Sequence, residues 1–502
     1  MTDYMQLIEE AKTYDISVVT PLDKLNILSK NHANNLWLKR EDLQPIFSFK
    51  CRGSFNNIAN LTEQQKHKGI IAASAGNHAQ GVALSAKHLG IKAIVVMPTT
   101  TPVVKVQGVI KHGAEVILHG DNFDEAFAHT QKLIQQHGYT YVPPFDNEYT
   151  IAGNATVAKE LLSQCSEPID AVFVPVGGGG LLAGVAVYLK HISPNTKIIG
   201  IEPEHADSMF QALRHNKPVV IRNVNTFADG VAVARVGDKC FELVSKYVDH
   251  VISVSTDEIC AAIKDIFNDT RSLAEPSGAV ATAGMKKYLA QQKWQGKHCI
   301  AIHTGANLNF DRLQHIAERA VIGNNQEALL AVHVPNEPAS CYKLCQFIDK
   351  RSISEFNYRE NGDQAVIFLG VSLLPHEADD GDLIRTLEQA NFYVVSMTEN
   401  EIARSHIRHM VGGKRHNAAL DELCLEVILP NRPNALIELL ATLDNQFNIS
   451  LLHYRDNGAA YAKVLIGFDI GIYKHKQVTS LLDKAEYRYV LVNDNPAYKL
   501  FL

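Results

Sequence analysis

Several features that define membrane, secreted or nucleic-acid-binding proteins are absent from this sequence. No run of about 18 apolar residues is present, and "MTDYMQLIEEAKTYD" at the N-terminus lacks the apolar core of a secretion signal. The eight cysteines are scattered without a CxxC pair, which favours reduced thiols over a disulfide framework. The net charge of -6 shows no strong bias. We therefore expect a cytoplasmic protein without a nucleic-acid or membrane partner.

The sequence also lacks three common catalytic motifs. It contains no HExxH, no G-x-S-x-G and no Walker A motif. The sequence therefore lacks the signatures of zinc-dependent hydrolases, serine hydrolases and P-loop phosphoryl-transfer enzymes. What is present is an ordinary globular composition, with 46% hydrophobic and 20% charged residues in 502. This length exceeds what one core usually organises, so we expect two or three domains.

Short apolar runs alternate with longer segments of helical period from residue 36 to about 310. The runs are "GIIAAS", "KAIVVM", "AEVILHG", "AVFVPV", "KIIGIE" and "CIAIH". Nearly continuous Val and Ile strands joined by helical crossovers predict an α/β fold of parallel strands with helices on both faces. In such sheets ligands bind beyond the carboxyl ends of the strands. We therefore expect the chemistry directly after "GIIAA", "AVFVPV" and "CIAI".

The C-terminal third contains an internal repeat. The segments "LLAVHVPNEPASCYKLCQFIDKRSISEFNYRENG" and "LCLEVILPNRPNALIELLATLDNQFNISLLHYRDNG" correspond, with Pro335 and Pro430 separated by 95 residues (430 − 335). Arg359 and Arg455 are separated by 96 (455 − 359). Each copy predicts a strand, a Pro-containing turn, an amphipathic helix and two further strands around "NG". A duplicated α+β module can serve packing alone or bind a regulator, and we favour the regulator because loops on rigid scaffolds often carry function.

These changes in sequence pattern predict the domain organisation. Between the copies, "IARSHIRHMVGGKRHN" is basic and contains glycine, which favours a solvated linker over a phosphate site. The expected parts are a first domain, a linker, repeat one, a second linker and repeat two, at residues 1–320, 321–327, 328–400, 401–419 and 420–502.

At the stretch "SFKCRGS", Ser48–Ser54, Lys50 follows two phenylalanines, Phe47 and Phe49, and precedes a Cys-Arg-Gly turn. Desolvation between aromatic rings disfavours an ammonium ion and lowers its pKa, which provides the free amine needed for imine formation with an aldehyde. Most lysines lie on the surface. From this motif alone, an ordinary surface lysine and an imine-forming lysine both stay open.

The second motif is "ASAGNHAQG", Ala73–Gly81, after the strand "GIIA". Ser74 and Asn77 are expected as N-cap residues of a helix whose free N–H groups favour an anion such as a substrate carboxylate. Ordinary helix capping is the alternative, although one such residue would suffice for it. We expect His78 to be a structural residue rather than a base.

The third motif is "VPVGGGGLLAG", Val174–Gly184, where four glycines separate a strand from a helix. Glycine lets the backbone approach a phosphate closely, and the helix dipole adds attraction. A dinucleotide fingerprint is the rival, because Gly178, Gly180 and Ala183 match G-x-G-x-x-G/A, and Glu202 follows 22 residues later (202 − 180). Against nicotinamide binding, that fingerprint normally opens its domain, and it leaves the lysine motif unexplained.

The fourth motif is "IHTGANLNF", with Thr304 directly after a strand. A neutral hydroxyl there can bond a heterocycle nitrogen without forcing its protonation. Together "SFKCRGS", "ASAGNHAQG", "GGGGL" and "HTGAN" resemble the fold-type II pyridoxal-phosphate enzymes. The resemblance continues through "LKREDLQPIFSFK", "VMPTTTP", "PPFD", "FADGVAV" and "AEPSGA". With a tail similar to two ACT-like regulatory repeats, nearly the whole chain resembles the threonine dehydratase (threonine deaminase) family.

The resemblance implies a role for each motif. Lys50 would be the Schiff-base lysine of pyridoxal 5'-phosphate, Asn77 would hold the ring hydroxyl, and Thr304 would face the pyridine nitrogen. Ser74 and Asn77 would receive the substrate carboxylate. The residues implied to hold the phosphate are Gly177, Gly178, Gly179, Gly180 and Leu181.

The resemblance also implies the reaction and its control. L-Threonine, and with it L-serine as a second candidate substrate, would lose water and ammonia, and threonine would give 2-oxobutanoate as the first step towards isoleucine. Lys50 would remove the Cα proton, and Thr304, which cannot act as a carboxylate counter-ion, would leave the pyridine nitrogen largely unprotonated and favour elimination over transamination. Isoleucine would inhibit, valine would oppose it, and the assembly would be a homotetramer.

Three positions depart from the pattern of related enzymes. Cys51 stands where relatives usually have leucine, and Thr304 replaces the serine of close relatives. Ser208 stands where the serine racemase branch would need an acid for a divalent metal, so we expect no metal. Two further classes stay open at this point, a nicotinamide dehydrogenase and a catalytically idle amino-acid sensor.

Overall fold

The chain divides into two compact units, Met1–Ala320 and Val321–Leu502. We describe each unit by itself, from a computed structural model. The described residues are 2–323, 326–335, 344, 347–348, 351, 353–359, 364–374, 377, 379–409, 422–430, 435–443, 447, 449–455, 460–470 and 472–501. The division after residue 320 coincides with the expected end of the first domain, while the bounds of the linkers and repeats stay predictions.

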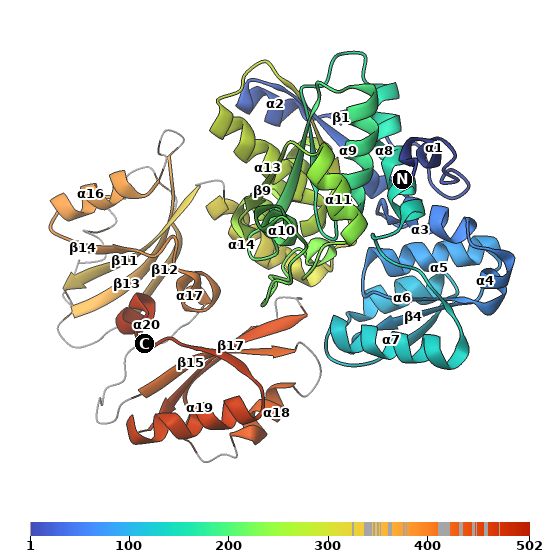
Figure 1. Ribbon diagram of the computed structural model, residues 1–502. Helices are drawn as coiled ribbons and strands as arrows, with labels where there is room; N and C mark the ends of the chain where they lie inside the picture. Colours follow the sequence, from blue (N-terminus) through green and yellow to red (C-terminus); the bar gives the residue numbers. More distant parts are fainter. Residues whose placement is uncertain are drawn as a thin grey trace. The chain divides into compact units, whose positions relative to one another are not determined.

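A six-stranded sheet organises the larger lobe of the first unit (Figure 1). Its strands, in spatial order, are β1 (Leu22–Lys24), β2 (Asn35–Arg40), β10 (His298–His303), β7 (Ala171–Pro175), β8 (Lys197–Pro203) and β9 (His250–Val254). Only β1 is antiparallel to its neighbour; the other pairs are parallel. The predicted parallel arrangement is confirmed, with one short antiparallel edge strand added.

Helices cover both faces of this sheet because its strands alternate between two cores. Val172 and Val174 pack in one buried cluster with helices α8 (Glu148–Gln164) and α9 (Gly180–Ile192). Phe173, between them, points the other way and packs with the helices of the second cluster. Those helices are α2 (Asn26–His32), α12 (Thr256–Thr270), α13 (Pro276–Gln292) and α14 (Leu313–Gly323).

A second, four-stranded sheet forms the smaller lobe and is parallel throughout. Its order is β5 (Glu115–Leu118), β4 (Ala93–Met97), β3 (Ile70–Ala73) and β6 (Thr140–Tyr141). Helix α5 (Asn77–Leu89) packs on one face and α7 (Phe123–His137) on the other (Figure 1). The remaining elements of the unit are α1 (Tyr4–Glu9), η1 (Glu41–Leu43), α3 (Lys50–Ala59), α4 (Glu63–Lys68), α6 (Val103–Lys111), α10 (Ser208–His215), η2 (Asp229–Val231), α11 (Asp238–Tyr247) and η3 (Phe310–Arg312).

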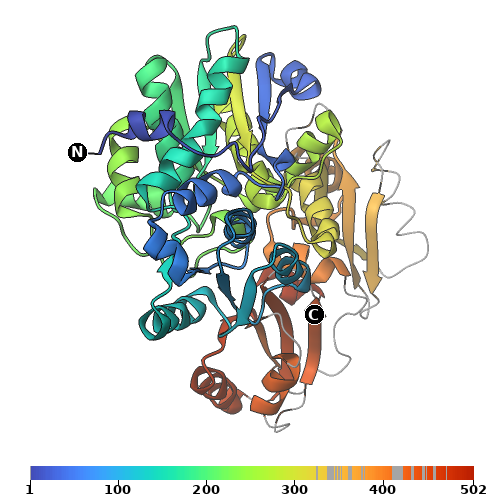
Figure 2. The same cartoon turned by 90° about the vertical axis from the view of Figure 1, so that its right-hand side faces the viewer.

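The second unit contains two four-stranded antiparallel sheets of the same topology, coloured yellow-orange and red in Figure 2. The first has the order β12 (Ile353–Arg359), β13 (Gln364–Ser372), β11 (Glu327–Pro335) and β14 (Tyr393–Ser396). The second has the order β16 (Ile449–Arg455), β17 (Tyr461–Asp469), β15 (Glu422–Pro430) and β18 (Arg488–Leu491). The predicted duplication is therefore confirmed strand by strand.

Equivalent hydrogen bonds recur in the two copies at the same sequence offset. The amide of Leu329 donates to Thr398 Oγ1 over 3.0 Å, and the amide of Cys424 donates to Asn493 Oδ1 over 2.9 Å. Both partners shift by 95 residues (424 − 329 and 493 − 398), which is the spacing of the prolines in the sequence repeat. The duplication thus extends to individual polar contacts.

The helices of the second unit follow the prediction in part. They are α16 (Gly381–Gln389), α17 (Glu401–Ser405), α18 (Ala435–Thr442), α19 (His475–Lys484) and α20 (Pro496–Phe501), with the short turns η4 (Ile407–His409) and η5 (Ile472–Lys474). Helix α18 is the one predicted after the Pro430 turn. Its counterpart in the first copy falls between 336 and 352, largely outside the described residues.

The expectation of a solvated linker at 401–419 is wrong for its first part. Ile402, Ala403 and Ile407 are buried in a core cluster of the second unit, because α17 and η4 pack their apolar side chains inwards. Residues 410–421 lie outside the described part of the chain.

The described residues contain no helix long and apolar enough to cross a membrane. The thiols of the described cysteines are free, in agreement with the predicted reduced thiols, and all but one are buried. They are Cys51, Cys165, Cys240, Cys260, Cys299 and Cys424.

Candidate active site

Lys50 is the first residue of α3, and the loop before it is held against the segment after β10. Ser48 and Gly305 form an antiparallel bridge, and the amide of Phe49 donates to the carbonyl of Thr304 over 3.3 Å. Lys50 and Thr304, which are 254 positions apart in the chain (304 − 50), are therefore held by neighbouring strands of backbone. The structure brings the first and fourth sequence motifs together.

The predicted aromatic environment of Lys50 is half correct. Its Nζ lies 5.2 Å from the centroid of the Phe49 ring, but Phe47 is 58% exposed and cannot desolvate the amine. The reason is a left-handed backbone at Phe47, with φ of 55°, which turns this side chain away. Nζ also donates to the carbonyl of Pro144 over 3.3 Å. Burial lowers the pKa of Lys50 to about 8, although Cys240 and Glu275 act in the opposite direction.

The glycine loop between β7 and α9 packs closely against neighbouring side chains. A Cβ at Gly178 would lie 2.3 Å from the ring of Phe145, and a Cβ at Gly179 would lie 2.7 Å from Met209 Cε. Gly179 also has a φ of 97°, which favours glycine. Because Phe145 follows Pro144, the carbonyl that accepts from Lys50 directly precedes the residue that packs against the loop. The first and third motifs thus meet at this segment.

The other glycines of the loop are also confined. A Cβ at Gly177 would lie 3.0 Å from the Cα of Val231, and a Cβ at Gly180 would lie 3.0 Å from the carbonyl oxygen of Phe145. Leu181, the next residue, is buried in the core of the larger lobe. The loop therefore has little freedom, and α9 begins at Gly180 with its first amide groups at the end of β7.

The second motif begins α5, but its helix cap differs from the prediction. The N-cap is Gly76, and neither Ser74 nor Asn77 caps the helix with its side chain. Ser74 Oγ instead accepts from the amide of Gly76 over 3.2 Å, within the turn that precedes the helix. The first amides of α5 consequently have no side-chain cap, which leaves them available to an anion.

Asn77 is hydrogen-bonded on both sides of its amide. Its Nδ2 donates to Glu275 Oε1 over 2.6 Å, and its Oδ1 accepts from Asn307 Nδ2, also over 2.6 Å. An amide side chain has two N–H donors and two acceptor sites. Asn77 therefore keeps one donor and one acceptor for a ligand, in an orientation fixed by two neighbours.

Sequence reasoning missed Glu275 and Asn307. Glu275 is only 4% exposed, and burial raises the pKa of its carboxyl to about 7. Asn307 also donates to the carbonyl of Ile46, so it connects Asn77 to the loop before Lys50. Both residues stand in stretches that carry the family resemblance, Glu275 in "AEPSGA" and Asn307 in "HTGAN", but neither stretch indicated a role for them.

Thr304 and His78 complete the predicted set. Thr304 is 4% exposed, and its Oγ1 donates to the carbonyl of Ser277 over 3.1 Å. His78 Nε2 lies 3.0 Å from the carbonyl of Val142, and burial lowers the pKa of His78 to about 3. A neutral histidine bonded to backbone agrees with the expected structural role.

The dinucleotide alternative is wrong. The carboxylate of Glu202 accepts from the amides of Met209 and Phe210, each over 2.8 Å, and so binds the first turn of α10. Glu202 is fully buried, and burial raises its pKa to about 8. A carboxylate engaged in this way has no place for a ribose hydroxyl.

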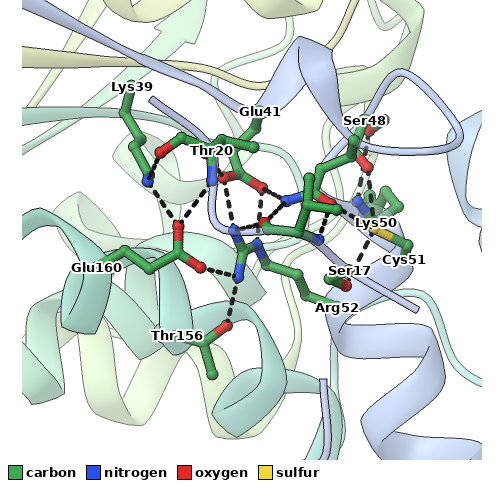
Figure 3. A network of polar contacts seen from close by, with 12 residues as sticks. Ser17, Thr20, Lys39, Glu41, Ser48, Lys50, Cys51, Arg52, Thr156 and Glu160 are labelled. Carbon is green, nitrogen blue, oxygen red and sulfur yellow. Dashed lines mark hydrogen bonds and ion pairs between the residues drawn. The ribbon is translucent and has the colours of Figure 1, made fainter. Parts of the chain in front are cut away.

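A buried ion-pair network fixes the helix that carries Lys50 (Figure 3). Arg52 donates to Glu41 Oε2 over 2.7 Å and to Glu160 Oε1 over 2.6 Å, and Lys39 donates to Glu160 Oε2 over 2.6 Å. These residues come from β2, η1, α3 and α8 and are almost completely buried. Fully paired charges with several hydrogen bonds restrict the orientation of the first turn of α3.

These residues suit pyridoxal phosphate. They provide a partly buried amine of lowered pKa for the aldehyde, a glycine loop at a helix start for the phosphate, an amide with free capacity for the ring hydroxyl and a neutral hydroxyl for the ring nitrogen. Two α/β lobes with this set of groups define a pyridoxal-phosphate-dependent enzyme of fold-type II.

Family models agree with this class. Residues 15–305 match the model described as "Pyridoxal-phosphate dependent enzyme". Residues 318–407 and 414–502 match "C-terminal regulatory domain of Threonine dehydratase". With both parts present in this order, the chain belongs to the threonine dehydratase family.

Curated relatives resemble the chain over its whole length. It is 46% identical to "L-threonine dehydratase biosynthetic IlvA" of Escherichia coli (strain K12), covering all of this chain and 97% of that protein. It is 45% identical, with the same coverage, to the protein of that name from Pasteurella multocida (strain Pm70). "Threonine dehydratase, mitochondrial" of Saccharomyces cerevisiae is 42% identical over all of this chain and 89% of that protein.

Solved structures resemble part of the chain. The processed form of threonine deaminase isoform 2 from Solanum lycopersicum is 45% identical, with a TM-score of 0.62 over 63% of this chain and 92% of that chain. The threonine deaminase of T.th. is 34% identical, with a TM-score of 0.57 over 61% of this chain and 99% of that chain.

Proposed function

We propose that this protein is a biosynthetic L-threonine ammonia-lyase, which converts L-threonine to 2-oxobutanoate and ammonia as the first step towards isoleucine. The observation that carries the proposal is the partly buried amine of Lys50, with its pKa lowered to about 8, beside the glycine loop. The full-length similarity to named threonine dehydratases supports the substrate.

Different residues of the site would bind different parts of the cofactor. Pyridoxal phosphate, when bound, supplies an aldehyde that links to the substrate amine and a ring that withdraws electrons from Cα. Lys50 would hold the aldehyde, Gly177 to Leu181 would hold the phosphate, and Asn77 would hold the ring hydroxyl with its free donor. Each group is thus positioned before the reaction begins.

Thr304 and Lys50 control where protons lie. Thr304 has a single hydroxyl hydrogen, which it donates to the carbonyl of Ser277 and which could instead be donated to the ring nitrogen of the cofactor. A neutral hydroxyl does not stabilise a protonated nitrogen, which favours elimination over transamination. The released Lys50 amine removes the Cα proton, while Ser74 and the first amides of α5 hold the substrate carboxylate.

A visible spectrum and one substitution test this proposal. The purified protein is expected to absorb near the visible band of a lysine-linked cofactor, and borohydride is expected to fix the cofactor on Lys50. Lys50→Ala should lose both the band and turnover of L-threonine, with L-serine assayed in parallel. A variant that keeps the band and the activity would remove Lys50 from the mechanism.

We also propose that isoleucine inhibits the enzyme through the second unit and that valine opposes it. The supporting observations are the duplicated α+β fold and the match to a family model described as regulatory. Such control requires isoleucine to bind two states of the enzyme unequally, typically by about 1 to 3 kcal/mol. Titration of both amino acids against threonine turnover measures this coupling.

We further propose a homotetramer in the cytoplasm. The resemblance to the family supports the assembly, and the free thiols among the described cysteines suit a reducing compartment. Light scattering on the 55.5 kDa chain tests the assembly, with a dimer or a monomer as the contrary result.

A further inference from the structure

Glu275 is a buried acid of the site to which the proposed function gives no role. It precedes α13, and its backbone amide donates to the carbonyl of Gly305 over 3.1 Å. Its Oε1 accepts from Asn77 Nδ2 over 2.6 Å. The carboxyl is therefore fixed between the start of α5 and the segment that follows β10, where the second and fourth motifs meet.

Space for this carboxyl is kept open by glycine. A Cβ at Gly305 would lie only 2.5 Å from Glu275 Oε1, closer than any real contact of a Cβ atom. In the part of the chain that the structure describes, Glu275 Oε2 makes no hydrogen bond. One oxygen is thus used for positioning, and the other is available to a ligand.

Burial favours a proton on Glu275 near neutral pH, against the hydrogen bond from Asn77, which lowers the pKa of the carboxyl. Burial raises the pKa of the carboxyl to about 7, and Asp229 on η2 acts in the same direction. Lys105 on α6 and Arg312 on η3 act in the opposite direction, and Lys105 is already ion-paired with Asp229. A substantial fraction of the carboxyl is therefore protonated at pH 7.

Lys50 and Glu275 are close enough for an electrostatic interaction between their side chains. The charge of Glu275 raises the pKa of the Lys50 amine, against the larger effect of burial. In its unprotonated form the Lys50 amine is a base, and in its protonated form the Glu275 carboxyl is an acid, the complementary pair that an elimination needs. Lys50 supplies the base, and the leaving hydroxyl group of threonine requires an acid.

We propose that Glu275 is that acid and donates its proton to the β-hydroxyl oxygen of threonine. This inference rests on the proposed function. The Cα–H bond breaks and its proton goes to the Lys50 amine; the electron pair forms the Cα=Cβ bond. The Cβ–O bond breaks, its electron pair stays on oxygen, and the proton of Glu275 completes a water molecule. Return of the Lys50 proton to Glu275 through solvent restores both groups.

The test compares two leaving groups in one variant, Glu275→Gln. The glutamine carbonyl can still accept from Asn77 but has no acidic proton. L-Threonine loses hydroxide, which needs a proton, whereas β-chloro-L-alanine loses chloride, which does not. We expect kcat for L-threonine to fall by at least about 100-fold and kcat for β-chloro-L-alanine to change by less than about threefold. Cofactor Kd, measured by fluorescence titration, should be unchanged.

Failure of this inference and failure of the proposed function would give different results. An equal loss with both substrates, or a weakened cofactor Kd that accounts for the loss, would give Glu275 a structural role and overturn the inference alone. A wild-type protein that eliminates neither substrate would overturn the proposed function with it.

A second measurement needs no variant. For the wild-type enzyme, kcat with L-threonine should decline as rising pH removes the Glu275 proton, and this decline should be missing with β-chloro-L-alanine. The same decline with both substrates would overturn the inference, even if Glu275→Gln failed to fold.

Discussion

At the scale of the residue, the chemistry depends on two groups whose pKa values burial moves in opposite directions. Burial lowers the pKa of the Lys50 amine to about 8 and raises that of the Glu275 carboxyl to about 7. Desolvation disfavours the charged form in each case, so the base loses its proton more easily and the acid keeps its proton longer. The same physical cause therefore prepares both partners of an elimination.

The lowered pKa of Lys50 predicts how the cofactor-free protein reacts. The rate of imine formation with pyridoxal phosphate should rise with pH around a midpoint near 8, rather than near the ordinary value of 10.5. At pH 7 the free amine would be about 300 times more abundant than for an ordinary lysine. Stopped-flow absorbance measures the rate, with Lys50→Ala giving the background from other amines. A midpoint above pH 10 would contradict the burial argument.

Sequence predicted the residues whose motif itself indicated a role and missed those whose role arises only from folding. Lys50 and the glycines stood in recognisable motifs. Glu275 is a single carboxylate without a partner at a fixed spacing, and its importance arises from Asn77, 198 residues earlier (275 − 77), which only folding brings near. The exposure of Phe47 likewise follows from a local φ of 55° that its residue type does not indicate.

At the scale of the element, the glycine loop shows how backbone conformation restricts a sequence. Gly179 has a φ of 97° in the turn between β7 and α9, and its missing Cβ makes room for Met209 and Cys240. A side chain would both strain the backbone and collide with two core residues. This position therefore requires glycine for two independent reasons.

Gly179→Ala should weaken cofactor binding by about tenfold or more. The left-handed backbone costs an alanine about 1–2 kcal/mol, and the loop can relieve this strain and the collision only by moving from its phosphate-binding conformation. Fluorescence titration of the cofactor gives the Kd.

Gly296→Ala is the matched control for this variant. Gly296 has a φ of 66°, and a Cβ there would meet nothing within 4 Å. The control should bear a similar backbone cost but leave the Kd unchanged. An unchanged Kd in Gly179→Ala as well would remove the loop from phosphate binding.

Strands were easier to predict than their arrangement. Nearly continuous apolar runs such as "AIVVM" identified β4 and its neighbours, because a strand buried on both faces needs apolar residues throughout. Their division into a six-stranded and a four-stranded sheet, and the antiparallel position of β1, depend on pairing between distant segments. Local patterns do not contain that information.

At the scale of the whole molecule, the internal repeat was the most informative feature of the C-terminal third. The offset of 95 residues (495 − 400) also relates Asn400 and Asn495, whose side chains meet over 3.2 Å. A contact between equivalent residues of two copies indicates a local two-fold relation within the second unit. Helix α17 was mistaken for linker because its five residues are too short for a helical period to be seen.

Removing everything after Gly323 should separate activity from regulation. The truncated chain keeps α14, whose Ile316 and Ala320 are buried in the core of the larger lobe. Threonine turnover should stay within about threefold, and inhibition by isoleucine should disappear, because the effector no longer has a second unit to bind.

Steady-state turnover of the full-length and truncated proteins, each with isoleucine titrated, measures both expectations. Equal inhibition of the two proteins would place the effector site in the first unit. A truncated protein that is folded and binds cofactor but is inactive would show that the first unit does not contain the complete site. Loss of inhibition with activity retained requires that the two functions lie in separate parts of the chain, as the division after Ala320 indicates.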